Sequence, residues 1–314
     1  MQEHHPGNPL NNLEKLLKQA NQTPKSQDTL DDSQERRNKH YEDRVVVFLD
    51  ILGFKDFIRK SQAAENLDNL IFALEQPKNP SANKFISTWK IEKTADDYDD
   101  KLTTFSDFFA FSVPLKVDEN DRLTVEGAEN LALLIYTSFF RARELLTHGF
   151  LCRGGISAGW LYHDDSNENQ ILFGPAFNRA YQLESELASI PRIILDSKVK
   201  NLIYDYNKSP DNASCKFYKL FDAHIKQAID GPAYIDIFAD FYTKTESAYP
   251  TYLDIDKDII AIRNHLCEKL QDSTDNPHVF HKISSISRLF NKALKDSGRG
   301  HNQSLLVPSE YLPE

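Results

Sequence analysis

The sequence predicts an α+β fold in which strands and amphipathic helices alternate, and three observations support this class. Residues 45–49 form a continuous run of branched and aromatic apolar residues, which is typical of a buried central strand. Two β-rich runs within 101–113 flank the pair Ser106-Asp107, as in a tight hairpin. Apolar residues recur with helical spacing on one side of about 124–148. Together these stretches predict a domain in which strands and helices alternate along the chain.

Composition and charge exclude several classes of protein. The 314 residues carry a formal net charge of −10, with a pI near 5.5, which argues against a nucleic-acid-binding surface. The 3 cysteines are far apart and form neither a disulfide framework nor a zinc cluster, so a reducing cytoplasm is the simplest setting. No apolar run approaches the ~18 residues of a membrane span. We therefore expect a cytoplasmic protein that neither binds nucleic acid nor spans a membrane.

Three segments differ in composition. Residues 1–43 are polar and nearly free of aromatic residues, so we expect a disordered extension. Residues 44–240 hold the strands and helices of the main domain. Residues 241–314 are expected to form a C-terminal helical extension.

The remaining elements follow along the chain. Extended pieces are expected at 85–90, 150–158, 193–195, 217–221 and 233–237, and helices at about 54–74, 175–188, 256–271 and 278–294. The order strand, helix, strand, strand, helix, strand is the ferredoxin-like βαββαβ arrangement, here followed by an α-rich extension. Right-handed crossovers then place the third strand between the first two and antiparallel to them.

This topology brings two acidic residues to one edge of the sheet. Asp50 ends the first strand, and Asp107 lies in the hairpin turn that precedes the third strand. Two unpaired carboxylates side by side are unfavourable unless a cation lies between them. Ligand sets made only of oxygen suit magnesium or manganese. The alternative that stays open is that Asp50 caps the following helix and Asp107 is an ordinary turn residue.

Four motifs in order resemble the catalytic domain of class III nucleotidyl cyclases. They span roughly residues 44–196 and comprise Phe48–Phe54 (FLDILGF), Phe105–Asp107 (FSD), Arg153–Gly159 (RGGISAG) and Phe173–Ala180 (FGPAFNRA). Within that superfamily the chain is most similar to the pyrimidine cyclases of the bacterial Pycsar antiphage systems. The segments that carry this closer resemblance are 154–156, 173–176, 181–184 and 191–194.

The resemblance implies a two-metal mechanism. Asp50 and Asp107 would bind two divalent cations, Mn²⁺ or Mg²⁺, with the carbonyl of Ile51 as a further ligand. Such ions, about 3.5–4 Å apart, lower the pKa of the ribose 3′-hydroxyl and neutralise the charge of the leaving pyrophosphate. The backbone amides near Gly53 and Phe54 would cradle phosphate oxygens.

At the positions that recognise the base, the residues of this chain differ from those of the purine cyclases that it resembles. Thr103 stands four residues before Asp107, where adenylyl cyclases carry an adenine-reading lysine, and Ile171 stands in the place of that lysine's partner acid. A guanine-reading glutamate is absent as well. Thr103 can donate or accept one hydrogen bond and leaves a smaller pocket, which suits a pyrimidine but does not choose uracil over cytosine.

The catalytic helix also departs from the family in one place. Asn178 matches the asparagine that positions the ribose. The transition-state arginine normally follows four residues later, where this chain has Gln182. Arg179 is the candidate substitute, and Arg192 is a second. Arg153, next to glycines on a strand, is expected to form an ion pair.

By resemblance, the chain is expected to convert UTP to 3′,5′-cyclic UMP and pyrophosphate as a homodimer with composite active sites. The cyclic pyrimidine product would act on a separate effector protein in antiphage defence. CTP is the alternative substrate. A non-catalytic nucleotide-sensing dimerisation module, favoured by Gln182, and a metal-dependent phosphohydrolase on the same carboxylates are the other hypotheses.

Overall fold

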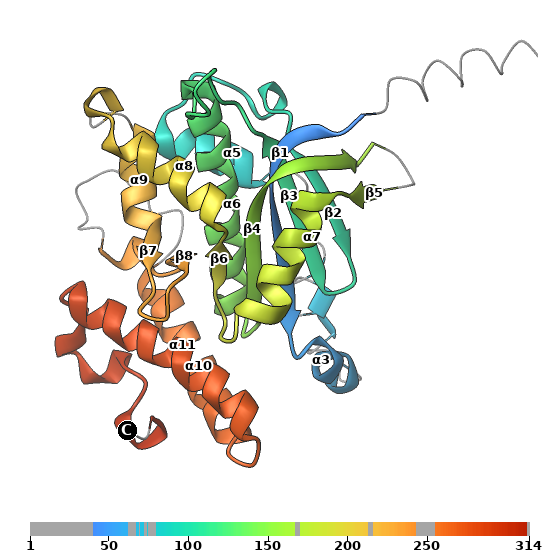
Figure 1. The fold of residues 1–314 in the computed structure, drawn as a ribbon. Helices are drawn as coiled ribbons and strands as arrows, with labels where there is room; N and C mark the ends of the chain where they lie inside the picture. The colour runs from blue at the N-terminus through green and yellow to red at the C-terminus, as the bar shows by residue number, and fades with distance from the viewer. Residues whose placement is uncertain are drawn as a thin grey trace, which may run out of the picture. The chain divides into compact units, whose positions relative to one another are not determined.

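A mixed β-sheet lies at the centre of the fold, with helices on both of its faces (Figure 1). The computed structural model describes residues 40–312, with gaps at 62–66, 69, 72–73, 75–79, 167–169, 213–215 and 243–254. Most of the expected N-terminal extension, 1–39, lies outside the described residues. None of the helices in the described part of the chain is long and apolar enough to cross a bilayer.

In the described part of the chain the sheet has 8 strands, which hydrogen-bond in the order β2-β3-β1-β4-β6-β8-β7, and β5 pairs with β4. The strands are β1 (Glu42–Leu52), β2 (Lys101–Phe105), β3 (Phe108–Pro114), β4 (Leu151–Asp164), β5 (Ile171–Phe173), β6 (Ile193–Leu195), β7 (Ile225–Gln227) and β8 (Ala233–Ile235). Strand β3 lies between β2 and β1 and is antiparallel to both. This is the ferredoxin-like order, so the predicted α+β class and the position of the third strand are confirmed.

The helices follow the predicted alternation with some differences. They are α3 (Phe54–Lys60), α5 (Pro80–Trp89), α6 (Val125–Thr147), α7 (Pro175–Gln182), α8 (Ser197–Lys208), α9 (Lys216–His224), α10 (Ile255–Asp272) and α11 (Pro277–Asp296), and a π-helical turn, Leu183–Leu187, continues α7. Helix α8 was not predicted. It begins at Asp196, whose side chain accepts a hydrogen bond from the amide of Val199 and so caps the helix.

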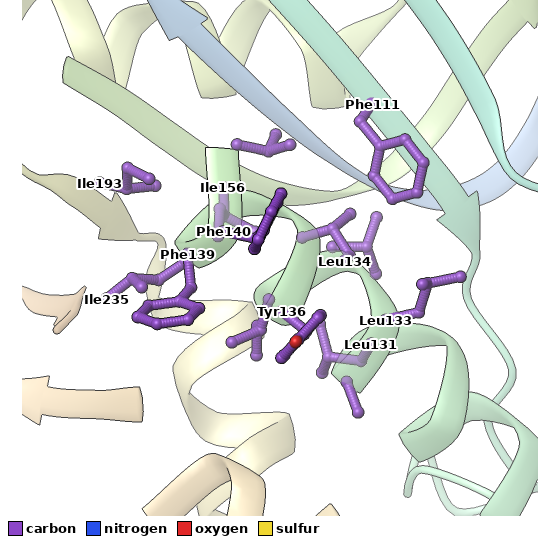
Figure 2. Close-up of a cluster of buried hydrophobic side chains, with 14 of the residues drawn as sticks. Phe111, Leu131, Leu133, Leu134, Tyr136, Phe139, Phe140, Ile156, Ile193 and Ile235 are labelled. Atoms are coloured by element: carbon purple, nitrogen blue, oxygen red, sulfur yellow. The ribbon is translucent and has the colours of Figure 1, made fainter. Parts of the chain in front are cut away.

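Strand β1 is buried on both faces because its side chains alternate between two apolar layers. Val45, Val47 and Leu49 join the main core around α6. Val46 and Phe48 point to the other face, where they pack with residues of α7. Figure 2 shows the main core, in which aromatic and leucine side chains of α6 gather with residues from the strands. The continuous apolar run is therefore explained by two-sided burial.

Helix α6 forms where the apolar periodicity predicts it. The hydroxyl of Thr124 accepts a hydrogen bond from the amide of Gly127 at 3.0 Å and caps the N-terminus. Nearly every side of the helix is buried, because the sheet covers one side and α5, α9 and α10 pack against others.

Two predicted extended pieces are helices, and the predictions for 85–90 and 217–221 are wrong. In α5, Pro80 occupies the first turn, where a missing N–H costs no hydrogen bond, and Phe85 packs against Tyr98 and Tyr136. In α9, the buried Phe217 and Leu220 are three residues apart on one helical face. Short runs of aromatic residues fit both the strand period of 2 and the helix period of about 3.6, and tertiary packing decides which structure forms.

The C-terminal helices α10 and α11 confirm the predicted α-rich extension. They pack against each other around a second apolar cluster that includes Ile262 and Phe290 and is completed by Leu146 and Leu151. Residues Tyr41–Glu314 make up one compact unit. The expected boundary near residue 240 stays a prediction.

Candidate active site

Asp50 and Asp107 lie together at one edge of the sheet. Asp50 is near the end of β1, and its partner in β3 is Phe108, the residue directly after Asp107. The amide of Ile51 donates to the backbone carbonyl of Asp107 at 3.0 Å, which ties the hairpin turn to the end of β1. The left-handed conformation of Ser106, with φ +55°, closes this turn. The structure thus brings together the two acids that the topology predicts; their role as metal ligands stays a prediction.

The local electrostatics of Asp50 show uncompensated negative charge. Its pKa is raised from the ordinary value of 3.8 to about 6. Burial is the main cause, and the carboxylates of Glu184 and Asp107 raise the pKa further, whereas Arg153 lowers it. The positive charge near Asp50 therefore does not offset its burial and the two neighbouring carboxylates.

Arg153 is one cation beside this pair. It lies opposite Asp50 in the antiparallel register of β1 and β4, so both side chains project from the same face of the sheet. Its guanidinium forms an ion pair with Glu184 at 2.5 Å, which confirms the predicted ion-pair role. Burial raises the pKa of Glu184, while Arg153 lowers it. Arg141 lines a hollow beside Asp50 and Asp107, so the three acidic groups Asp50, Asp107 and Glu184 lie near two arginines.

The double glycine of β4 brings α7 and its π-helical turn close to the acids. A Cβ on Gly155 would lie 2.2 Å from the carbonyl oxygen of Ala180, and one on Gly154 would lie 2.7 Å from that of Phe48. Both distances are shorter than a side chain tolerates. Another backbone therefore approaches Gly154-Gly155 closely, and this approach places Glu184 within reach of Arg153.

The hollow beside the acids is small. Asp50, Asp107, Thr104 and Cys152 are among the residues that line it, and its volume is about 20 Å³. Larger hollows of about 390 and 690 Å³ lie against α11 and share no lining residue with it. We assign the chemistry to the acidic edge in spite of its size, because it combines a perturbed carboxylate with a second acid. A nucleotide would have to lie over the sheet edge, outside this hollow.

The donor set at the acidic edge fits divalent cations that prefer oxygen. Among the described residues, no group of three or more His, Cys, Asp and Glu side chains could hold a metal ion. Magnesium sites, however, commonly use one or two carboxylates together with phosphate oxygens of the substrate. The side chain of Ile51 is buried in the core, so only its backbone carbonyl remains as a ligand.

The predicted phosphate cradle lies directly after the acid. Gly53 has φ +77°, a left-handed conformation that glycine adopts without strain, and it precedes the first residue of α3. The side chain of Phe54 is buried in the main core, so only its backbone amide is available to a ligand. A role of these amides in phosphate binding stays a prediction.

Thr103 lies in β2 on the same sheet face as Asp50. Its partner in β3 is Ala110, which in turn pairs with Phe48, two residues before Asp50. The hydroxyl of Thr103 is buried and contacts Nε2 of His163 at 3.0 Å. The sequence analysis named Thr103 but missed His163, which lies near the end of β4, beyond the predicted end of that strand at residue 158.

The residues expected on the catalytic helix lie apart from the acids. Asn178 is exposed on α7, and the guanidinium of Arg179 donates to Gln182 at 2.7 Å. Arg192 forms an ion pair with Asp230 at 2.5 Å. Within the described part of the chain, no hydrogen bond or ion pair joins these three residues to Asp50 or Asp107. Sequence reasoning also missed Glu184, which could be assigned only through its packing against Arg153.

Comparisons with known proteins returned structural likeness alone. No protein-family model and no curated protein matches this chain. Two solved structures described as a bacterial light-regulated adenylyl cyclase are 15% and 16% identical, with TM-scores of 0.34 and 0.39. Each match covers 72% of this chain, and 98% and 57% of the other chain, respectively. The guanylyl cyclase Cya2 is 11% identical with a TM-score of 0.29, over 52% of this chain and 78% of its own. These values establish neither a family nor an activity.

Proposed function

We propose that this chain is a pyrimidine nucleotide cyclase that converts UTP to 3′,5′-cyclic UMP and pyrophosphate. The observation that carries the proposal is the pairing of Asp50 with Asp107 at one sheet edge, where burial and the carboxylates of Glu184 and Asp107 raise the pKa of Asp50. These are the acids that the motif resemblance names as metal ligands. A divalent cation is the simplest partner for such a pair.

The acidic edge would bind two cations, Mn²⁺ or Mg²⁺, through Asp50, Asp107 and the carbonyl of Ile51. When bound, such cations lower the pKa of the attacking 3′-hydroxyl and offset the charge that develops on the leaving pyrophosphate. The chain's own residues would then hold and orient the nucleotide. The amides at Gly53 and Phe54 offer hydrogen bonds to phosphate oxygens.

The remaining roles follow from the position of each side chain. Asn178 would position the ribose, and Arg179 would stabilise charge in the transition state after exchanging its hydrogen bond to Gln182 for one to phosphate. Thr103 would contact the base. Its small side chain supports a pyrimidine, with UTP as the preferred substrate and CTP as the alternative.

A homodimer would complete the site. The exposed position of Asn178 and the volume of about 20 Å³ beside the acids both support a nucleotide held between two chains. Each composite site would take the acidic pair from one chain and Asn178 from its partner. The cyclic product would act on a separate effector protein, in keeping with the resemblance to antiphage cyclases.

The test is product identification. The purified full-length chain is incubated with Mn²⁺ and each of the four nucleoside triphosphates separately, and the products are separated and weighed by mass spectrometry. We expect cyclic UMP from UTP, loss of at least 100-fold in rate for Asp50→Asn and for Asp107→Asn, and little change for Asp43→Asn. Asp43 is a matched control because it is an exposed aspartate on the same strand. Full activity in either site variant would refute the mechanism.

A non-catalytic nucleotide-sensing module is the second candidate. The observation that favours it is Gln182, which stands at the expected arginine position and holds Arg179 in a hydrogen bond. This candidate predicts nucleotide binding without pyrophosphate release. A linear monophosphate as the product would instead indicate a phosphohydrolase.

A further inference from the structure

A buried hydrogen-bond chain leads from Arg44 to Thr103 across the sheet face that carries the acidic pair. Nε of Arg44 donates to Oγ of Ser112 at 3.0 Å. The same oxygen lies 2.7 Å from Nδ1 of His163, and Nε2 of His163 lies 3.0 Å from Oγ1 of Thr103. Arg44 and Ser112 are both 0% exposed, so water reaches neither of them.

The direction of the hydrogen bonds is set at the Arg44 end. A guanidinium has no acceptor, so the hydroxyl oxygen of Ser112 accepts from Arg44. Within the described residues, the other partner of this hydroxyl is His163, so the hydroxyl proton is donated to Nδ1. The orientation of Arg44 is fixed by further hydrogen bonds to Glu42 and to the side chain and carbonyl of Asp99.

The hydrogen bond that Nδ1 of His163 accepts determines that Nε2 donates to Thr103. Burial, and to a lesser extent Arg44, lowers the pKa of His163 to about 4, so the imidazole is neutral near pH 7. A neutral imidazole that accepts at Nδ1 carries its hydrogen on Nε2. Nε2 therefore donates to the oxygen of Thr103, and the hydroxyl proton of Thr103 is left without a partner among the residues that the structure describes.

The reverse direction is unfavourable. If Thr103 donated to His163, Nδ1 would donate to Ser112, and the Ser112 proton would be orphaned where no water can enter. An unsatisfied buried donor costs more than one at the rim of a site. Thr103 is 7% exposed, against 0% for Ser112, and it lies on β2, a strand at the end of the sheet.

We propose that Thr103 is a hydrogen-bond donor to the base, and that Arg44, Ser112 and His163 are positioning residues that keep its proton free. This proposal rests on the proposed cyclase function and adds base selection to it. A free O–H matches the carbonyl oxygen at C4 of uracil. It does not match the amino group at C4 of cytosine, which is itself a donor. The hydrogen bond from Thr103 thereby favours UTP over CTP.

The test compares kcat/KM for UTP and CTP in the full-length protein. Ser112→Ala removes the proton that fixes the tautomer of His163, and Thr103→Val removes the donor itself. We expect the UTP to CTP ratio to fall roughly threefold to tenfold in each variant, which corresponds to the loss of one hydrogen bond. Thr103→Ser retains the hydroxyl and is expected to keep the ratio.

Ser287→Ala is the matched control, because Ser287 is a buried serine in α11 whose hydroxyl donates to the carbonyl of Ile283. A general loss of folded protein lowers both rates equally and leaves the ratio unchanged. A second measurement uses 4-thio-UTP, whose sulfur is a weaker acceptor than O4. The wild type should discriminate against it relative to UTP, and Thr103→Val should lose that discrimination.

Each outcome decides the proposal. An unchanged UTP to CTP ratio in both Ser112→Ala and Thr103→Val refutes the donor role while the cyclase function stands. A wild-type preference for CTP refutes it equally. If circular dichroism shows that Ser112→Ala does not fold, the donor role is tested by the UTP to CTP ratio of Thr103→Val and by the discrimination against 4-thio-UTP. If no triphosphate yields a cyclic product, the proposed function fails and the donor role with it.

Discussion

Replacing Asp50 with asparagine is expected to stabilise the metal-free protein. The pKa of Asp50 rises from 3.8 to about 6 on folding, a difference of about 2 units, equivalent to about 3 kcal/mol. Because the carboxyl is only half buried, solvent screening reduces this figure, and we expect about 1–2 kcal/mol. The folded state binds this proton more tightly than the unfolded chain does. The contribution of Asp50 to stability is therefore fully present below about pH 4 and is lost as the pH rises through 6.

Urea denaturation in EDTA measures this difference. At pH 7.5 the free energy of unfolding of Asp50→Asn should exceed that of the wild type by about 1–2 kcal/mol, and the gap should close near pH 4. Asp43→Asn, the exposed control on the same strand, should show no gap at either pH. A variant that is less stable than the wild type at pH 7.5, or a gap that persists at pH 4, would refute the electrostatic account of the site.

Three further predictions concern the fold and the assembly. Gly155→Ala should lower the free energy of unfolding by about 1–3 kcal/mol, since its Cβ would lie 2.2 Å from a carbonyl oxygen of α7; denaturation equal to wild type would contradict the close packing. Thr124→Ala should cost about 1 kcal/mol in the same assay through loss of the α6 cap, and no loss would deny the cap's contribution. Mixing inactive Asp50→Asn and Asn178→Ala chains should restore roughly a quarter of wild-type activity if sites are composite, and no recovery would contradict the shared site.

The sequence predicts the fold class and the acidic pair because both depend on strong local signals and one topological rule. The branched run 45–49 is long enough to identify β1, and Ser106-Asp107 between two β-rich runs identifies the hairpin. Right-handed crossovers then leave one position for β3, and with it one position for Asp107. No long-range packing information is needed for this step.

The features that sequence reasoning missed depend on packing between distant segments. The pairing of Arg153 with Glu184 requires both the register of β1 with β4 and the close approach of α7 at Gly155. Likewise, the contact between His163 and Thr103 exists because β4 extends to Asp164, six residues beyond the predicted end of the strand at residue 158. No short-range pattern in the sequence encodes such contacts.

The helices α5 and α9 illustrate a second limit. Their apolar residues occupy windows of 10 and 9 residues that contain aromatic side chains. Such windows fit a strand or a helix equally well by composition. Burial against α6 selects the helix in both, and this partner is known only once the fold is known.

Measuring the binding of Mn²⁺ shows directly whether Asp50 and Asp107 form a divalent-cation site. Equilibrium dialysis would measure protein-bound Mn²⁺ in the presence of 3′-deoxy-UTP, which lacks the hydroxyl needed for cyclisation. If the two acids hold the cation, the wild type and Asp43→Asn bind Mn²⁺, and Asp50→Asn and Asp107→Asn do not. Equal Mn²⁺ binding by all four proteins would contradict it.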